Sequence, residues 1–239
     1  MPTKLNPSSG NAVDIESHRV VLDDLMKLID NRSTAIMDFK DLMNPKNNLA
    51  ESLKLIKSSR KAHVGDVPAM DLFLKLEAVA NACGSDSDWW KVLGEITEST
   101  FIALLQHKYG QVPLQEKTVI LENPQGVEIF NLEGKSMDAI VWDVDLDCGE
   151  MHEVKKAIIS RVGDKGFGRK LQLLAKFKKL AMKQSGKTNF IGVSTIFEQS
   201  RLIANLLESN FSIKERDIDV LGRDRIHVWL GKKYVGKAS

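Results

Sequence analysis

"MDAIVWDVDLDCGEMHEVKKA", residues 137–157, has the pattern of two β-strands joined by an acidic turn. An apolar run begins after Asp138, and the chain returns through Glu153-Val154-Lys155. Alternating apolar residues on either side of turn-forming residues are typical of an antiparallel hairpin. The stretch therefore predicts two neighbouring strands that bring carboxylates and a lysine together.

The strand period decides which of these side chains share a face. Side chains alternate along a strand, so Glu153 and Lys155 point to one face and Val154 to the other. A turn centred near residues 146–147 would place Asp138 opposite Lys155, with Glu153 on the diagonal. A shift of the register by one residue would turn Asp138 to the other face. We predict that all three side chains lie on one face.

This combination of residue types suits phosphodiester hydrolysis. Two carboxylates and a main-chain carbonyl between them offer the oxygen ligands that Mg²⁺ prefers. Such an ion can lower the pKa of a bound water and neutralise charge that builds on a phosphate. A lysine beside the ion can orient or deprotonate that water, or stabilise the phosphorus in the transition state.

The elements around the hairpin predict an α/β (α+β) fold in which a mixed central sheet is flanked by helices. A strand that follows the second helix should be parallel to one of the hairpin strands, because a crossover connection joins them. The predicted helices are 89–109, 168–184 and 198–209, and the predicted strands are 117–123, 127–132, 138–145, 150–157, 189–197, 217–222 and 225–235.

Asp138, a gap and then Glu153-x-Lys155 resemble the signature of the PD-(D/E)XK nuclease superfamily, and the order of elements across residues 89–197 is also similar. Met137 stands where the family often has proline. The resemblance implies a restriction-endonuclease-like core in which Asp138 and Glu153 bind Mg²⁺ and Lys155 is the catalytic lysine. It also implies cleavage that leaves a 5′-phosphate and a 3′-hydroxyl, with Mn²⁺ substituting for Mg²⁺.

The superfamily often adds a metal-binding acid from the helix before the strands. Helix 89–109 offers Glu95 and Glu98, which lie three residues apart and nearly on one face. Glu98 is the better placed, beside the apolar residues Phe101 and Ile102. The resemblance thus implies Glu98 as a third metal ligand, and Glu95 is the alternative.

Charge is distributed unevenly along the chain, although its net value is only +2. Residues 111–150 hold nine acidic residues and two lysines, whereas residues 151–187 hold eleven basic residues and two acids. A basic face beside a cation-binding pocket is what a nuclease needs. Residues 160–170 are predicted to form a flexible basic loop that faces double-stranded DNA, with phosphate contacts from Arg161, Lys165, Arg169 and Lys170.

The 239 residues are 43% hydrophobic, with no apolar run near the roughly 20 residues that a membrane span needs. We expect a cytoplasmic protein. Residues 1–85 are predicted to be a helical region for dimerisation or DNA recognition, and residues 86–239 the nuclease core.

A type II restriction endonuclease fits this organisation best, and such enzymes usually form homodimers that match palindromic DNA. Two alternatives stay open at this stage. One is a structure-specific nuclease of the repair or resolvase kind, and the other is a non-catalytic DNA-binding protein that keeps the fold. The sequence does not indicate the recognition sequence, the cut position or a partner methyltransferase.

Overall fold

The structure is a computed structural model that describes residues 3–7, 18–31, 33–42, 44, 47–123, 125–185, 189–232 and 234. The chain forms two compact units, one made of Asp14–Leu104 and the other of Met1–Val13 with Leu105–Ser239. The first is helical and the second is α/β, so the predicted α/β class is confirmed. The predicted domain boundary at residue 85 falls before α5 (Asp86–Tyr109), whereas the two units divide within that helix.

Local sequence signals explain where the helices of the helical unit begin. Asn48 and Glu51 form a capping box at the start of α3, and the side chain of Asp66 caps α4, which has proline in its first turn. Ser85 accepts a hydrogen bond from the amide of Asp88, so α5 begins earlier than the predicted residue 89. Besides α5, the unit contains α1 (Arg19–Asp30), α2 (Ala35–Leu42), α3 (Leu49–Ala62) and α4 (Val67–Ala82).

The α/β unit contains two sheets. The first is antiparallel, in the order β1-β2-β3, and the second is mixed, in the order β4-β5-β6-β7. The strands are β1 (Thr3–Pro7), β2 (Lys117–Glu122), β3 (Glu128–Met137), β4 (Ala139–Asp143), β5 (Cys148–Val154), β6 (Phe190–Ser194) and β7 (Asp219–Leu221). The helices are α6 (Lys165–Ser185), α7 (Ser200–Phe211) and α8 (Ile226–Gly231), with short 3-10 turns at Ile159–Arg161 and Arg223–Arg225.

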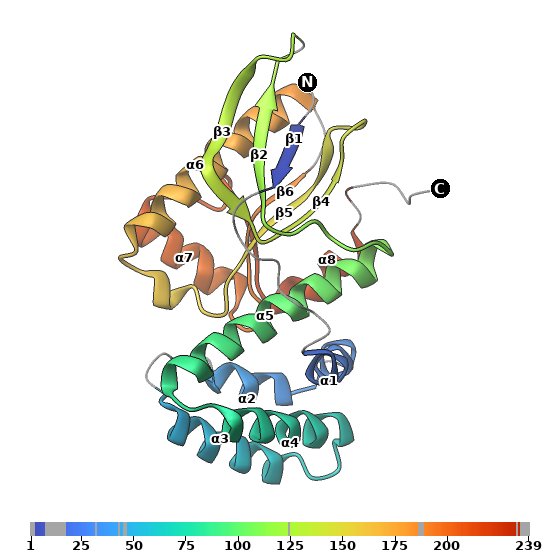
Figure 1. The fold of residues 1–239 in the computed structure, drawn as a ribbon, viewed down its shortest axis with the longest axis vertical. Coiled ribbons are helices and arrows are strands. Elements are labelled where there is room, and N and C mark those ends of the chain that lie inside the picture. The colour runs from blue at the N-terminus through green and yellow to red at the C-terminus, as the bar shows by residue number, and fades with distance from the viewer. Residues whose placement is uncertain are drawn as a thin grey trace. The chain divides into compact units, whose positions relative to one another are not determined.

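Helix α6 packs against strands of both sheets (Figure 1). It packs on β3 and β6, and its residues Phe167, Leu171, Leu174 and Phe177 are buried among residues of both sheets. Ile140 and Met151 belong to the same core. The face of β4 and β5 that carries them is therefore the face that α6 covers. The strand after α6 pairs in parallel with β5, as predicted.

Three predicted elements differ in the structure. Residues 225–235 were expected to form a strand, but α8 occupies much of that segment because its apolar residues Ile226 and Trp229 are buried at helical spacing. Residues 165–170 lie in α6 and not in a flexible loop. The region predicted as helical begins with β1, which pairs with β2. None of the described helices is long and apolar enough to cross a membrane.

Candidate metal centre

Asp138 lies at the junction of the two sheets. β3 ends at Met137 and β4 begins at Ala139, so Asp138 is the one residue between them. It is only 8% exposed, and its Oδ2 accepts hydrogen bonds from the amide of Val154 at 2.7 Å and from Nζ of Lys155 at 3.0 Å. These two contacts hold the carboxylate against the end of β5.

The register of β4 and β5 differs from the predicted pairing, but it still places the three predicted side chains on one face. Ala139 pairs with His152, and Asp138 and Glu153 are the residues next to this pair at the end of the ladder. The predicted pairing set Asp138 opposite Lys155 because it assumed a turn centred one residue too late. A shift of two residues leaves every side chain on its face. Asp138, Glu153 and Lys155 are brought together, as predicted.

Lys155 bridges the two carboxylates. Its Nζ lies 2.8 Å from Oε1 of Glu153 and 3.0 Å from Oδ2 of Asp138. Burial lowers the pKa of Lys155, but the two carboxylates outweigh burial and hold this pKa above its usual value. The neighbouring Lys156 shows the opposite shift, because burial and the charge of Arg161 lower its pKa to about 8. Lys155 is therefore an ammonium ion at neutral pH.

Glu153 is held between two lysines. It is 3% exposed, and while Lys155 faces Oε1, Nζ of Lys170 forms an ion pair with Oε2. Oε2 accepts no hydrogen bond from any residue that the structure describes, so the contact with Lys170 is ionic only. A buried carboxylate oxygen with a charge partner but no hydrogen-bond donor is well suited to accept a cation.

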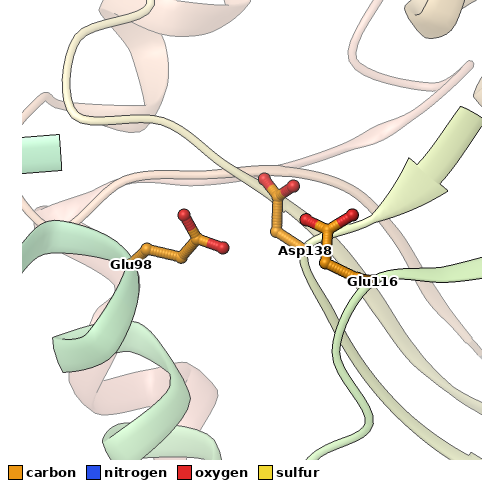
Figure 2. A group of neighbouring side chains, drawn as sticks. All are labelled: Glu98, Glu116 and Asp138. Carbon is orange, nitrogen blue, oxygen red and sulfur yellow. The ribbon is translucent and has the colours of Figure 1, made fainter. Parts of the chain in front are cut away.

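Glu116 is a candidate site residue that was not predicted from the sequence. One oxygen of Glu116 and one of Asp138 lie within 4.8 Å of each other, and Figure 2 shows the two carboxylates together. Ser136 donates a hydrogen bond to Glu116. Lys117 pairs with Met137, so Glu116 and Asp138 are the residues next to that pair at the end of the ladder. The β2–β3 pairing thus adds a second carboxylate beside Asp138.

The predicted helix acids lie in the helical unit. Glu98, which Figure 2 also draws, is half-buried on α5, and its role as a metal ligand stays a prediction. Glu95 is engaged elsewhere in that unit, since His18 lies 3.3 Å from one of its oxygens and Lys91 lies 3.8 Å from the other.

The carboxylates of the α/β unit fit a hard divalent cation. Asp138 and Glu116 have carboxylate oxygens close to each other, and Glu153 adjoins Asp138 through Lys155. Carboxylate oxygens favour Mg²⁺ or Mn²⁺ over the softer ions that prefer sulfur and nitrogen.

The four predicted DNA contacts have different surroundings. Arg161 lies 3.3 Å from Asp164, and Arg169 forms an ion pair with Glu133, so both charges are partly compensated at the surface. Lys165 is exposed at the start of α6. Lys170 reaches the carboxylates beside Lys155 and pairs with Glu153. These residues do not form one continuous row of unpaired positive charge.

The opposite face of β5 carries a buried polar network. Glu150 is fully buried, and it accepts hydrogen bonds from Lys108 at 2.5 Å, from Nε1 of Trp229 at 2.6 Å and from Tyr109. A pocket of about 450 Å³ lies beside Trp229. No carboxylate of the metal centre lines this pocket. The network and the pocket are therefore separate from the proposed chemistry.

No family model, curated protein or solved structure matches this chain.

Proposed function

We propose that the protein is a Mg²⁺-dependent DNA endonuclease with a PD-(D/E)XK-like site. The observation that supports this proposal is the convergence of Asp138, Glu153 and Lys155 at the end of one sheet, with Glu116 beside Asp138. The residue types and their order along the strands are those that the resemblance to this superfamily implies. The extra carboxylate, Glu116, adds an oxygen ligand that the signature itself does not require.

Each residue has a role that follows from its surroundings. Asp138, Glu116 and Glu153 would hold the ion, and a bound Mg²⁺ would supply an acidic water and neutralise charge on the scissile phosphate. The amide of Val154 fixes the orientation of Asp138. Lys155 is an ammonium ion tethered by two carboxylates, so it is suited to donate a hydrogen bond to a phosphate oxygen as negative charge builds there.

Among nucleases of this kind, we propose a sequence-specific type II restriction enzyme that acts on double-stranded DNA as a cytoplasmic homodimer. The helical unit and the basic residues near the start of α6 are the parts available for dimerisation and DNA contact. A structure-specific nuclease of the same chemistry is the second candidate. It would use the same carboxylates but would cut branched DNA regardless of sequence.

The test is digestion of unmethylated phage DNA with and without Mg²⁺. Wild type is compared with Lys155→Met, Asp138→Asn and the control Lys156→Met, which changes the adjacent lysine. We expect discrete fragments from wild type and Lys156→Met only when Mg²⁺ is present. Lys155→Met should lower the cleavage rate by about 10²- to 10⁴-fold, the usual range for loss of one catalytic charge.

Other outcomes separate the alternatives. A metal-dependent smear, or cutting restricted to branched DNA, would keep the chemistry and reject restriction. If folded wild type cuts neither linear, branched nor methylated DNA at any Mg²⁺ or Mn²⁺ concentration, the catalytic proposal is wrong. DNA binding that persists in EDTA would then support a non-catalytic DNA-binding protein.

A further inference from the structure

Lys170 is much less exposed than a surface lysine. It lies on α6 next to Leu171, which is fully buried in the core between the two sheets. Its side chain is only 13% exposed, and its Nζ forms an ion pair with Oε2 of Glu153. By contrast, Lys165 and Arg169 near the same end of α6 are exposed. The packing of α6 thus directs one lysine of the helix into the proposed metal centre.

The contact with Glu153 is ionic and lacks hydrogen-bond geometry. Lys155 already neutralises the other oxygen, Oε1, at 2.8 Å. Oε2 takes no hydrogen bond from the described part of the chain, and yet it is buried. Burial of a carboxylate is costly unless a nearby positive charge compensates for the lost hydration, and Glu153 is only 3% exposed. Lys170 provides that charge at the oxygen that a divalent cation would use.

We infer that Lys170 is a built-in counter-ion of Glu153, which occupies the cation position at Oε2 and is displaced when a divalent cation binds. The inference rests on the metal site of the proposed function. Two positive groups repel each other strongly at contact distance from one buried oxygen. Cation binding must therefore move the ammonium of Lys170 away, and the two compete. Lys170 then acts as a positioning residue that sets the affinity of the site for metal.

A purely structural lysine would behave differently. Its loss would destabilise the protein by the same amount with and without metal. If Lys170 is a counter-ion, its loss destabilises only the metal-free protein, because a bound cation supplies the missing charge. The neutral variant should also bind metal more tightly, since no ammonium competes for Oε2.

The experiment is a titration of full-length wild type, Lys170→Met and Lys179→Met with Mn²⁺, in which electron paramagnetic resonance measures the free ion. Lys179→Met is the matched control, because Lys179 is an exposed lysine on the same helix. We expect Lys170→Met to bind Mn²⁺ about tenfold more tightly than wild type. Its melting temperature should be lower than that of wild type in EDTA and equal to it at saturating Mn²⁺. Lys179→Met should match wild type in Mn²⁺ affinity and in melting temperature.

A second variant keeps the inference testable if Lys170→Met does not fold. Lys170→Arg retains the charge, so it should bind Mn²⁺ no more tightly than wild type, whereas Lys170→Gln should bind it more tightly. Equal or weaker Mn²⁺ affinity in both neutral variants would overturn the counter-ion role and leave the proposed nuclease untouched. Absence of Mn²⁺ binding by wild type would overturn both the counter-ion role of Lys170 and the proposed metal-dependent nuclease. The predicted change in affinity, found in a protein that cuts no DNA, would support the counter-ion and reject the nuclease.

Discussion

His152 and Glu150 lie two residues apart on one face of β5, and Nε2 of His152 is 2.8 Å from Oε2 of Glu150. Both side chains are fully buried. Nδ1 of His152 lies 2.8 Å from the hydroxyl of Ser194. Because a carboxylate only accepts hydrogen bonds, Nε2 must carry the proton and donate it. Strand alternation places this pair on the face of β5 opposite Glu153 and the proposed metal site.

Replacement of Glu150 by glutamine should destabilise the protein severely. The variant would leave the ammonium of Lys108, whose side chain is fully buried, without the carboxylate that now lies 2.5 Å away. Loss of one partner from a buried ion pair costs about 3–5 kcal/mol of unfolding free energy. Urea denaturation of Glu150→Gln and wild type measures this. The control Glu208→Gln, at an exposed position of α7, should change stability by less than about 0.5 kcal/mol. A loss below about 1 kcal/mol in Glu150→Gln would contradict the prediction.

The protein should lose stability as the pH falls below 6.5. Burial lowers the pKa of His152 from its ordinary 6.5, and this effect outweighs the opposite influence of Glu150. The unfolded chain therefore binds a proton near pH 6.5 that the folded chain rejects. Stability from this group is fully present above that pH and is lost as the pH falls. We expect the free energy of unfolding to fall as the pH is lowered from about 7.5 to about 5.5, because the folded protein resists protonation of this histidine.

Nitrogen-15 NMR of the imidazole isolates His152 from the other histidines during the same titration. Its signals should still be those of a neutral ring protonated at Nε2 when the pH passes below 6.5. If its ring instead became protonated near pH 6.5 while the protein stayed folded, the predicted pH dependence would be wrong. Glu150 affects the stability of the protein at a lower pH than His152 does. Burial raises its pKa, but His152 and Lys108 outweigh burial and hold it below 4.5.

Strand alternation explains why much of the site was predictable. Asp138, Glu153 and Lys155 share a face in any register that differs by an even number of residues, so an error of two residues did no harm. The α/β class followed from the change of hydrophobic period along the chain, which the structure confirms. These features depend on local patterns, which a single sequence contains.

Contacts between distant segments were not predictable in the same way. Lys170 reaches Glu153 only because α6 packs across both sheets, and Glu116 reaches Asp138 only through the pairing of β2 with β3. The segment at residues 225–235 has strand-like composition, yet burial of Ile226 and Trp229 favours a helix. In each case contacts with distant parts of the chain, which local sequence patterns do not show, determine the structure.

Replacement of Glu116 by glutamine should weaken metal binding without unfolding the protein. Glu116 is half-buried, and one of its oxygens lies within 4.8 Å of an oxygen of Asp138, so the change removes one negative charge from the proposed cation site. Loss of one carboxylate ligand should lower Mg²⁺ affinity at least about tenfold, because oxygen ligand charge sets affinity for hard cations. Isothermal titration calorimetry measures this, and circular dichroism checks the fold. The control Glu128→Gln changes an exposed acid on β3 and should leave affinity unchanged. Equal Mg²⁺ affinity in Glu116→Gln and wild type would remove Glu116 from the site and leave Asp138 and Glu153 as its ligands.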